Sequence, residues 1–314
     1  MSRIVVLGAG AFGTALAMAA ARAGNSVTLY ARRPEQAEEM ARTRENPRLP
    51  GIRLRNEIAP TSDLPDAADA LLLAVPAQQT AGFLSRHAQD LPQAPLVLCA
   101  KGIDLETLRL QTEIAGSARP TAALTGPGFA SEIGQGLPTA LTLAGPEALT
   151  EPLQSMLASP TFRLYRTPDA IGAQLGGALK NVVAIAAGIT IGAGLGESAR
   201  AATITRGFAE MRRLAAAMGA REDTLMGLSG FGDLALTAGS DKSRNFAHGR
   251  ALGGAKSAKA QTVEGVATAR AATQLAERHG LEMPLAQAVR DVLEGALGVG
   301  DAIGQLLARP AGRE

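Results

Sequence analysis

The sequence contains a single cysteine, Cys99, only three histidines and almost no net charge. One cysteine excludes an intramolecular disulfide framework and a cysteine-rich metal site, and it indicates a reducing compartment. The histidines lack the close spacing of metal ligands, so we predict no catalytic metal. Lys and Arg number 31 against 29 Asp and Glu. This near-balance excludes the global positive field that binding to nucleic acid or to an anionic membrane would require.

Two uncharged stretches could be mistaken for membrane signals. Residues 4–21 resemble the apolar region of a signal peptide, but a regular pattern of glycines interrupts them. Residues 182–196 carry no charge, but a spanning helix needs about 20 residues, and this stretch is shorter and contains four glycines. We read it as a buried helix with its exit loop. We therefore predict a soluble cytoplasmic protein without membrane insertion.

The length and composition indicate a globular protein. At roughly 150 residues per domain, a chain of 314 residues should form two domains. With 46% hydrophobic and 19% charged residues, the chain can bury a sizeable core. A disordered or fibrous protein is thereby excluded.

Short apolar runs alternate with helical stretches through the first half of the chain. The runs are nearly continuous rather than alternating, as expected for parallel strands that are covered on both faces. Helical stretches such as 14–23 and 76–87 separate them. This order predicts a doubly wound α/β sheet. The predicted strands are residues 4–7, 27–30, 70–75, 96–99, 122–125, 140–143 and 162–165.

The strand signal stops after Pro168. Apolar residues at helical spacing predict helices over 204–218, 262–279 and 284–297, with Gly219 as a C-cap. We therefore predict an N-terminal dinucleotide-binding domain of residues 1–168. An all-helical domain of residues 169–314, which binds substrate and carries the catalytic group, should follow it.

A glycine fingerprint, Gly8-Ala9-Gly10-Ala11-Phe12-Gly13, follows the first predicted strand and leads into a helix. Gly8 permits a tight turn, Gly10 lets the backbone approach a pyrophosphate, and Gly13 allows close packing of the helix on the strand. An ordinary glycine-rich turn would be the alternative. The strand and helix on either side favour a Rossmann-type dinucleotide site instead.

The second predicted strand ends at Tyr30-Ala31-Arg32-Arg33. A site specific for NAD would place Asp or Glu here to bind the ribose. Two guanidinium groups in its place could pair with a 2′-phosphate, which favours NADP over NAD. The alternative is that Arg32 and Arg33 are solvated loop charges.

Two further loops follow predicted strands. They should lie at the carboxyl ends of the strands, where ligands of open α/β sheets bind. Lys101 comes directly after strand 96–99, and Gly126-Pro127-Gly128-Phe129-Ala130 follows the next strand. The lysine would bring an ammonium group to the crevice, and the glycine-rich loop would bring backbone N–H groups. Either could equally be a surface turn.

Lys180 is the most unusual charged residue of the second half, because 15 uncharged residues follow Asn181. Such a charge must either extend outward to solvent or occupy a functional cleft. Desolvation and a neighbouring lysine would lower its pKa and make it a usable acid or base near neutrality. Asn181 can point toward the same cleft edge.

Two polar clusters follow Lys180 along the chain. Asp233 stands in an apolar, glycine-rich turn, where it is either a helix N-cap or a partner for Lys180. Ser243-Arg244-Asn245 follows a polar loop and is expected to open a helix, an arrangement suited to a phosphate group. Each cluster alone has an ordinary structural explanation. Together they describe an anion site that faces a lysine and an aspartate.

In these stretches the sequence resembles the soluble bacterial family of NAD(P)-dependent glycerol-3-phosphate dehydrogenases. The match covers nearly the whole chain in the family's order, and the segments in the helical half are far more specific than the glycine fingerprint. The matching segments are GAGAFGTALA near the N-terminus, VPA at 75–77, AKGI at 100–103, LTGPGFASE at 124–132, GALKNVVAIAAGI at 177–189, ITRGFAEMRRL at 204–214, GLSGFGDLALT at 227–237, SRN at 243–245 and VEG at 263–265.

The resemblance implies reversible reduction of dihydroxyacetone phosphate to sn-glycerol 3-phosphate, which supplies glycerophospholipid synthesis. It implies NADP(H) or NAD(H) as cofactor, with NADP(H) favoured by the arginine pair, and a homodimer. Lys180 would be the general acid that protonates the carbonyl oxygen. Residues near the substrate would be Lys101, Gly126, Asn181, Asp233, Thr237, Ser243, Arg244 and Asn245. Those near the cofactor, beside the fingerprint glycines and Arg33, would be Ala11, Phe12, Arg32, Lys101, Ala130, Arg244, Thr262 and Glu264.

The chain departs from the family pattern at Gly128, where the family usually has serine. The N–H of Gly128 could still serve the substrate, but the missing hydroxyl would weaken its binding. Tyr30 replaces a frequent tryptophan, which is a milder change.

Two other functions fit the same architecture. One is a reductase of a β-hydroxy or keto acid, which would not need both Lys101 and the cluster at 243–245. The other is a non-catalytic NADP sensor, which would have no need of a desolvated Lys180 beside Asp233. Gly128 is the one feature that favours the sensor.

Overall fold

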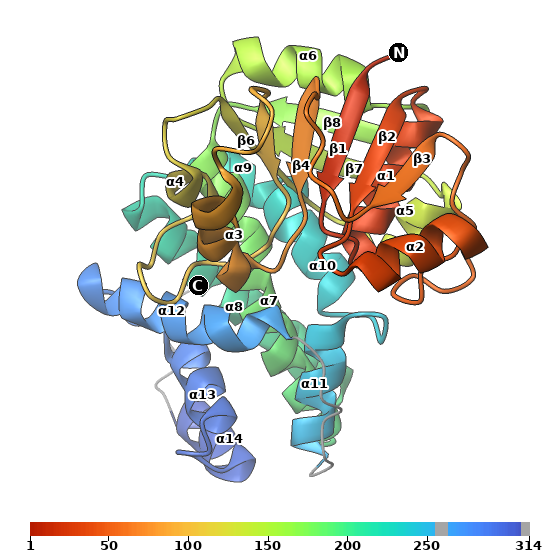
Figure 1. The fold of residues 1–314 in the computed structure, drawn as a ribbon. Coiled ribbons are helices and arrows are strands. Elements are labelled where there is room, and N and C mark those ends of the chain that lie inside the picture. The colour runs from red at the N-terminus through yellow and green to blue at the C-terminus, as the bar shows by residue number, and fades with distance from the viewer. Residues whose placement is uncertain (255–262, 309–314) are drawn as a thin grey trace. The chain divides into compact units, whose positions relative to one another are not determined.

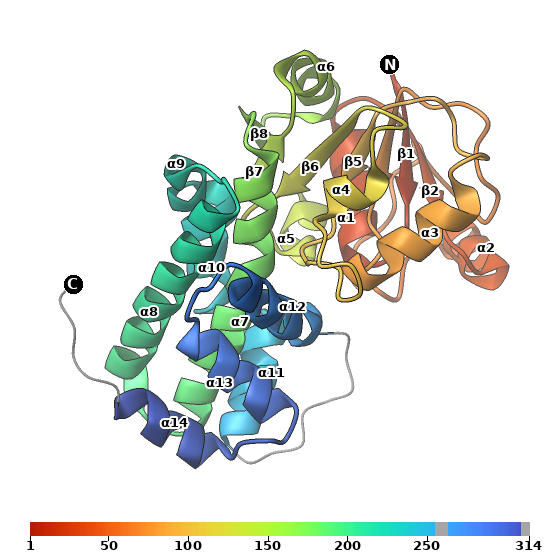
Figure 2. The same cartoon turned by 90° about the vertical axis from the view of Figure 1, so that its left-hand side faces the viewer.

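The computed structural model describes residues 1–254 and 263–308. The chain forms two compact units (Figures 1 and 2). One contains residues 1–101 and 109–174, and the other contains residues 102–108 and the chain from 175 onward. The short segment 102–108 therefore leaves the first unit and joins the second. The division at residue 174 lies shortly after the predicted boundary at residue 168, and the division of tasks between the two domains stays a prediction.

Within the described residues, the first unit is built on an eight-stranded sheet with the strand order β3-β2-β1-β4-β5-β6-β7-β8. Neighbouring strands are parallel except β6 and β7, which are antiparallel. The strands are β1 (Arg3–Leu7), β2 (Ser26–Tyr30), β3 (Ile58–Thr61), β4 (Ala70–Leu73), β5 (Leu96–Leu98), β6 (Thr121–Thr125), β7 (Thr139–Ala144) and β8 (Phe162–Thr167).

Helices cover both faces of this sheet, which explains its continuous apolar runs. In β1, Ile4 and Val6 face a core that includes α1, α2, α5 and α6, while Val5 and Leu7 face a core that includes Phe83 of α3. The helices of this unit are α1 (Ala11–Arg22), α2 (Pro34–Thr43), the 3-10 turn η1 (Ala77–Gln79), α3 (Thr80–His87), α4 (Gln111–Ala115), α5 (Ala130–Gln135) and α6 (Glu147–Leu157).

The predicted strands are all present, with ends that differ by one or two residues, and the predicted doubly wound fold is confirmed. Four details differ from the prediction. The edge strand β3 was not expected, and β7 runs antiparallel to β6. The helix after the fingerprint begins at Ala11 rather than at residue 14, so Gly13 lies within its first turn. The stretch 76–87 divides into η1 and α3.

The secondary-structure elements of the second unit are all helices within its described residues, as predicted. The stretch 284–297 was predicted as one helix, but α13 ends at Leu293 and a further helix, α14, follows. The elements are α7 (Ala170–Gly192), which begins in the first unit, then α8 (Gly196–Ala217), α9 (Glu222–Met226), a π-helical turn η2 (Leu228–Gly232), α10 (Asp233–Thr237), α11 (Arg244–Gly253), α12 (Glu264–Arg278), α13 (Pro284–Leu293) and α14 (Val299–Leu307).

Glycines bring α7 and α11 into backbone contact. A Cβ atom at Gly188 of α7 would overlap the carbonyl oxygen of Phe246, and one at Gly249 of α11 would overlap the carbonyl oxygen of Ile185. The close approach fixes the start of α11 beside the middle of α7. Among the described residues, α7 alone is long and apolar enough to cross a membrane, and 89% of its most apolar window is buried.

Candidate functional site

The fingerprint glycines differ in what surrounds them. Gly8 has a φ of +119°, and a Cβ atom there would lie 2.9 Å from the carbonyl oxygen of Ala74. A Cβ atom at Gly13 would overlap the carbonyl oxygen of Gly8, whereas nothing lies within 4 Å of one at Gly10. Gly8 and Gly13 are therefore required by the protein's own packing. Gly10 instead keeps an open space at the surface, which suits the approach of a pyrophosphate.

The N-terminus of α1 faces this open space. Gly10 is the N-cap of α1, and its first turn contains no acidic residue. Ala11 and Phe12 follow, both half-buried. The first N–H groups of a helix have no partner within the helix and carry partial positive charge, so they attract a phosphate. The residues present therefore fit a dinucleotide.

The two arginines predicted to select the cofactor lie beyond the end of β2 and are exposed. Arg33 is the residue before α2, and its Nη2 donates to Oε1 of Gln36 over 3.5 Å. Since β2 pairs with β1, whose end carries the glycine loop, the arginines and the loop share one edge of the sheet. This is the position that a ribose-binding group requires.

Lys101 lies at the same sheet edge, after β5. Its Nζ donates to the carbonyl oxygen of Gly126 over 2.7 Å and lies 5.7 Å from the centre of the Phe12 ring. Gly126 has a φ of +133°, and a Cβ atom there would lie 3.2 Å from the Cα of Leu141. The structure therefore brings three predicted residues, Lys101, Gly126 and Phe12, into one cluster.

The loop after β6 leads into α5, whose first residue is Ala130. Gly128, where the sequence departs from the expected family pattern, faces apolar atoms of neighbouring side chains. A Cβ atom at Gly128 would lie 2.9 Å from Cδ1 of Ile133 and 3.2 Å from Cγ2 of Thr139. In this chain the volume of a serine is already partly filled by Ile133.

In the second unit, Lys180 of α7 forms a buried polar cluster with α10. Its Nζ lies 3.2 Å from Oδ1 of Asp233 and donates to Oγ1 of Thr237 over 2.7 Å. The Thr237 hydroxyl in turn donates to Oδ1 of Asp233 over 3.2 Å. The side chains of Lys180 and Asp233 are 8% and 2% exposed. Asp233 is thus the partner of Lys180, and the N-cap of α10 is Gly232.

This cluster gives Lys180 the properties of a proton donor. An ammonium group carries three N–H bonds, and the carboxylate and the hydroxyl orient it. The carboxylate also stabilises the positive charge in a desolvated position. Lys180 can therefore donate a proton to an oxygen that develops negative charge.

Asn181 and Asn245 connect three helices. Nδ2 of Asn245, on α11, donates to Oδ1 of Asn181 over 2.8 Å, and Oδ1 of Asn245 accepts the N–H of Gly265, in the first turn of α12, over 3.1 Å. The Oγ of Ser243 accepts the N–H of Phe246 over 3.2 Å and caps α11, so the cluster at 243–245 opens a helix, as predicted. These amides fix the start of α11 next to Asn181 of α7.

Arg244 is the first residue of α11 and is exposed, and no acidic residue lies in that first turn. Glu264, half-buried, is the first residue of α12. Thr262 lies outside the described residues. The structure therefore brings predicted residues together at the sheet edge of the first unit and, in the second unit, in the cluster of Lys180 and in the contact of Asn245 with Asn181.

Two family models match the chain along its length. Residues 3–149 match the N-terminal part of NAD-dependent glycerol-3-phosphate dehydrogenase, and residues 169–304 match its C-terminal part. The chain belongs to this family. A glycerol-3-phosphate dehydrogenase [NAD(P)+] from Paracoccus denitrificans is 53% identical, with 99% of each chain covered. One from a Bradyrhizobium species is also 53% identical, over 98% of this chain and 97% of its own length.

A solved structure of the same family has the same fold. The glycerol-3-phosphate dehydrogenase of Coxiella burnetii superposes with a TM-score of 0.93 at 35% identity, over 98% of this chain and 99% of that one. A pyridine nucleotide is therefore the cofactor class of this dehydrogenase family member. In the described part of the chain, no group of three or more His, Cys, Asp and Glu side chains is arranged to hold a metal ion.

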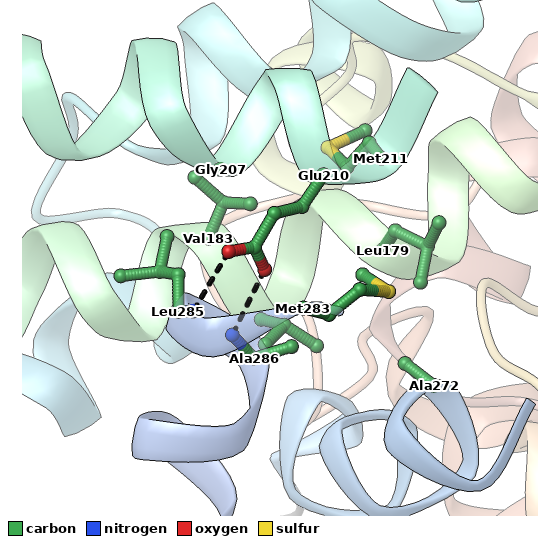
Figure 3. A pocket seen from close by; sticks show the side chains of 10 residues that line it. Leu179, Val183, Gly207, Glu210, Met211, Ala272, Met283, Leu285 and Ala286 are labelled. Atoms are coloured by element: carbon green, nitrogen blue, oxygen red, sulfur yellow. Dashed lines mark hydrogen bonds between the residues drawn. The ribbon is translucent and has the colours of Figure 1, made fainter. Parts of the chain in front are cut away.

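Sequence reasoning missed a buried acid of this dehydrogenase, Glu210 on α8. Its Oε1 accepts the N–H of Leu285 over 2.7 Å, and its Oε2 accepts the N–H of Ala286 over 3.1 Å, at the N-terminus of α13 (Figure 3). An adjoining cavity of about 10 Å³ is lined by apolar side chains of α7, including Leu179 and Val183. That volume is too small for a substrate, so Glu210 is a structural residue.

Cys99 and His248 have pKa values that burial displaces. Burial raises the pKa of the Cys99 thiol, which lies 3% exposed at the end of β5. Burial lowers the pKa of His248, half-buried on α11. Both shifts favour the neutral form of the side chain, and the Cys99 thiol is a small core group.

Proposed function

We propose that this protein reduces dihydroxyacetone phosphate to sn-glycerol 3-phosphate, and catalyses the reverse oxidation, with NADPH or NADH as the hydride donor. The single observation that carries this proposal is the buried cluster of Lys180, Thr237 and Asp233. It occurs in a chain of the glycerol-3-phosphate dehydrogenase family. When bound, the cofactor supplies a hydride to the carbonyl carbon.

Lys180 is the general acid in this proposal. As hydride adds to the carbonyl carbon, the C=O π bond breaks, and the oxygen takes a proton from Nζ of Lys180 to become the hydroxyl of the product. The neutral amine then regains a proton before the next turnover. Asp233 stabilises the ammonium form, and Thr237 orients Nζ through its hydroxyl.

The phosphate of the substrate is assigned to the start of α11. Arg244 supplies an exposed guanidinium there, and Ser243 and Asn245 stand on either side of it. Binding energy from the phosphate would hold the distant carbonyl in place for reaction. Lys101 and Gly126 supply the first unit's substrate contacts, and the N–H of Gly128 takes the place of the family's serine.

The cofactor is assigned to the glycine loop and the end of β2. The N–H groups at the start of α1 bind the pyrophosphate, and Arg32 and Arg33 bind a 2′-phosphate, which makes NADPH the preferred cofactor. Ala130, Thr262 and Glu264 are assigned to the cofactor by the family pattern. We further propose that the enzyme is a cytoplasmic homodimer that supplies glycerophospholipid synthesis.

The test is to mix purified protein with dihydroxyacetone phosphate and NADPH, and in parallel with NADH, and to follow nicotinamide absorbance. We expect rapid oxidation of the cofactor and formation of glycerol 3-phosphate, with the higher kcat/KM for NADPH. If NADPH binds but neither cofactor is oxidised, the dehydrogenase activity on this substrate is contradicted and the sensor function is favoured.

A further inference from the structure

The carbonyl oxygen of Ala9, in the middle of the glycine loop, accepts two side-chain hydrogen bonds. Gln36 Nε2 donates to it over 3.0 Å, and Asn46 Nδ2 donates to it over 3.2 Å. Gln36 lies on α2, and Asn46 lies in the segment that connects α2 to β3 (Figure 1). A carbonyl oxygen has two lone pairs, so these donors occupy both.

Asn46 is held in a single orientation. Its Nδ2 also donates to Oγ1 of Thr14 over 2.7 Å, and its Oδ1 accepts the N–H of Arg48 over 3.0 Å. The residue is 1% exposed, and Thr14 is fully buried in the first turns of α1. A buried amide with its donors and its acceptor engaged is costly to rotate, so it fixes the atoms that it contacts.

The direction of the Ala9 carbonyl sets the direction of the next N–H. The chain contains no cis peptide bond within its described residues, and in a trans peptide the C=O and the N–H point in opposite directions. Because Asn46 and Gln36 hold the Ala9 carbonyl toward the protein, the N–H of Gly10 points the other way. Nothing lies within 4 Å of a Cβ atom at Gly10, so this residue leaves open space for a ligand.

We propose that Asn46, together with Gln36, is a positioning residue for cofactor binding, because it aims the Gly10 N–H at the pyrophosphate. The inference rests on the proposed function and adds residues that the glycine fingerprint does not include. Without these donors the peptide between Ala9 and Gly10 can rotate, and the N–H no longer points at the anion. The pyrophosphate is common to NADPH and NADH, so both cofactors should be affected equally.

The first test is Asn46→Leu, which keeps the approximate volume and removes the donors. The Kd for NADPH and for NADH is measured from nicotinamide fluorescence, a clean signal because the chain has no tryptophan to transfer energy to it. We expect both Kd values to rise by about three- to tenfold, the range expected for loss of one hydrogen bond. The KM for dihydroxyacetone phosphate should change by less than about twofold, because a purely local effect on the loop leaves the substrate contacts in place.

Gln36→Met is the second test. If Asn46→Leu does not fold, this variant alone tests the proposal. Gln36 is only half-buried, and its Oε1 also accepts from Arg33. An effect through the Ala9 carbonyl weakens NADPH and NADH equally, which would support the proposal. An effect confined to NADPH would act through Arg33 and would overturn the role of Gln36.

The double variant Asn46→Leu/Gln36→Met removes both donors from one carbonyl. Its rise in Kd should exceed the product of the two single rises, because either donor alone can still hold the peptide. Thr14→Val is the matched control, since it removes one partner of Asn46 but neither donor to Ala9, and its Kd should rise by less than that of Asn46→Leu. If both single variants and the double variant fold and bind both cofactors like wild type, the proposal is overturned. Failure of the wild-type protein to bind either cofactor would instead contradict the proposed function.

Discussion

Nζ of Lys180 lies 3.2 Å from Oδ1 of Asp233, and both side chains are almost completely withdrawn from solvent. A buried ion pair contributes little net stability, because the cost of desolvating two charges offsets their attraction. Apolar residues of similar volume could fill the same space at no loss of stability. The pair is therefore better explained by the chemistry of the lysine than by the packing of α7 against α10.

The first prediction concerns Lys180→Met, which keeps the length of the side chain and removes its proton donor. We expect kcat for reduction of dihydroxyacetone phosphate to fall by about 10²- to 10⁴-fold, the usual contribution of a positioned acid. The Kd for NADPH should stay within about twofold of wild type, because the fingerprint is unaltered. Steady-state kinetics and nicotinamide fluorescence measure the two quantities.

Thr237 provides the matched control for Lys180. Thr237→Val removes the hydroxyl that accepts from Nζ, and Thr237→Ser keeps it. We expect the valine variant to lose about tenfold in kcat, the value of one hydrogen bond near 1.4 kcal/mol, and the serine variant to stay close to wild type. An unchanged turnover rate in Lys180→Met would remove this lysine from the role of acid.

The second prediction concerns Gly128→Ser, which introduces the serine expected from the family pattern. Its Cβ would lie 2.9 Å from Cδ1 of Ile133, a side chain that is 2% exposed. We expect the variant to lose about 1–2 kcal/mol in free energy of unfolding, the usual cost of overpacking a core. Urea unfolding measures the loss.

Ile133→Val separates packing from function at this position, because valine lacks the Cδ1 atom that crowds the serine. In Gly128→Ser/Ile133→Val we expect part of the stability to return. The KM for dihydroxyacetone phosphate should fall below that of wild type by about threefold or more, the value of a hydrogen bond from the added hydroxyl. If Gly128→Ser alone is as stable as wild type, Ile133 does not limit the size of the residue at position 128.

Much of this fold could be predicted, because parallel strands covered on both faces leave continuous apolar runs. Strand β3 left no such signal. It is an edge strand of four residues, Ile58–Thr61, in which only Ile58 is buried and Pro60 interrupts the apolar pattern. The direction of β7 could not be predicted either, since Leu141 and Leu143 are buried on the sheet whichever way the strand runs. Strand direction depends on the connection between the strands, and an apolar pattern does not record it.

The site residues divide in the same way. Lys180 could be found because a lone charge beside a long apolar run contradicts its surroundings. Asn46 and Glu210 could not, because a polar residue in a loop or on a charged helix looks like ordinary surface. Glu210 contacts residues 285 and 286, and no periodicity within α8 reports a partner so distant in the chain.

The third prediction concerns cofactor preference. In Arg32→Ala/Arg33→Ala we expect the KM for NADPH to rise by about 10- to 100-fold, because charged hydrogen bonds to a phosphate contribute about 1.5–3 kcal/mol. The KM for NADH should change by less than about threefold, since that cofactor lacks the 2′-phosphate. Parallel kinetics with the two cofactors give the ratio.

Arg42→Ala is the control for net charge in this experiment. Arg42 lies in the last turn of α2, the helix that follows Arg33, and its side chain is 75% exposed. Its replacement removes one positive charge from this helix without altering the end of β2. It should leave both KM values near wild type. A double arginine variant that still prefers NADPH would refute the assignment of Arg32 and Arg33 to the 2′-phosphate.

The last prediction concerns Glu210, which joins α8 to the N-terminus of α13. Its carboxylate accepts two backbone N–H groups, and the partial positive charge of the helix end stabilises the anion in its buried position. Glu210→Gln keeps one acceptor, so we expect it to lose about 1–2 kcal/mol in free energy of unfolding. Glu210→Leu leaves both N–H groups buried without an acceptor and should lose about 3–5 kcal/mol.

Urea unfolding of the three proteins tests the order wild type, glutamine, leucine. The kinetic constants of the glutamine variant should stay near those of wild type, because the cavity beside Glu210 is too small to bind substrate. Glu222→Gln, an exposed acid that pairs with Arg212 near the end of α8, is the control, and it should cost less than about 1 kcal/mol. A leucine variant as stable as wild type would mean that α13 does not depend on this carboxylate, since apolar packing against Val183 and Met211 would then suffice to hold it.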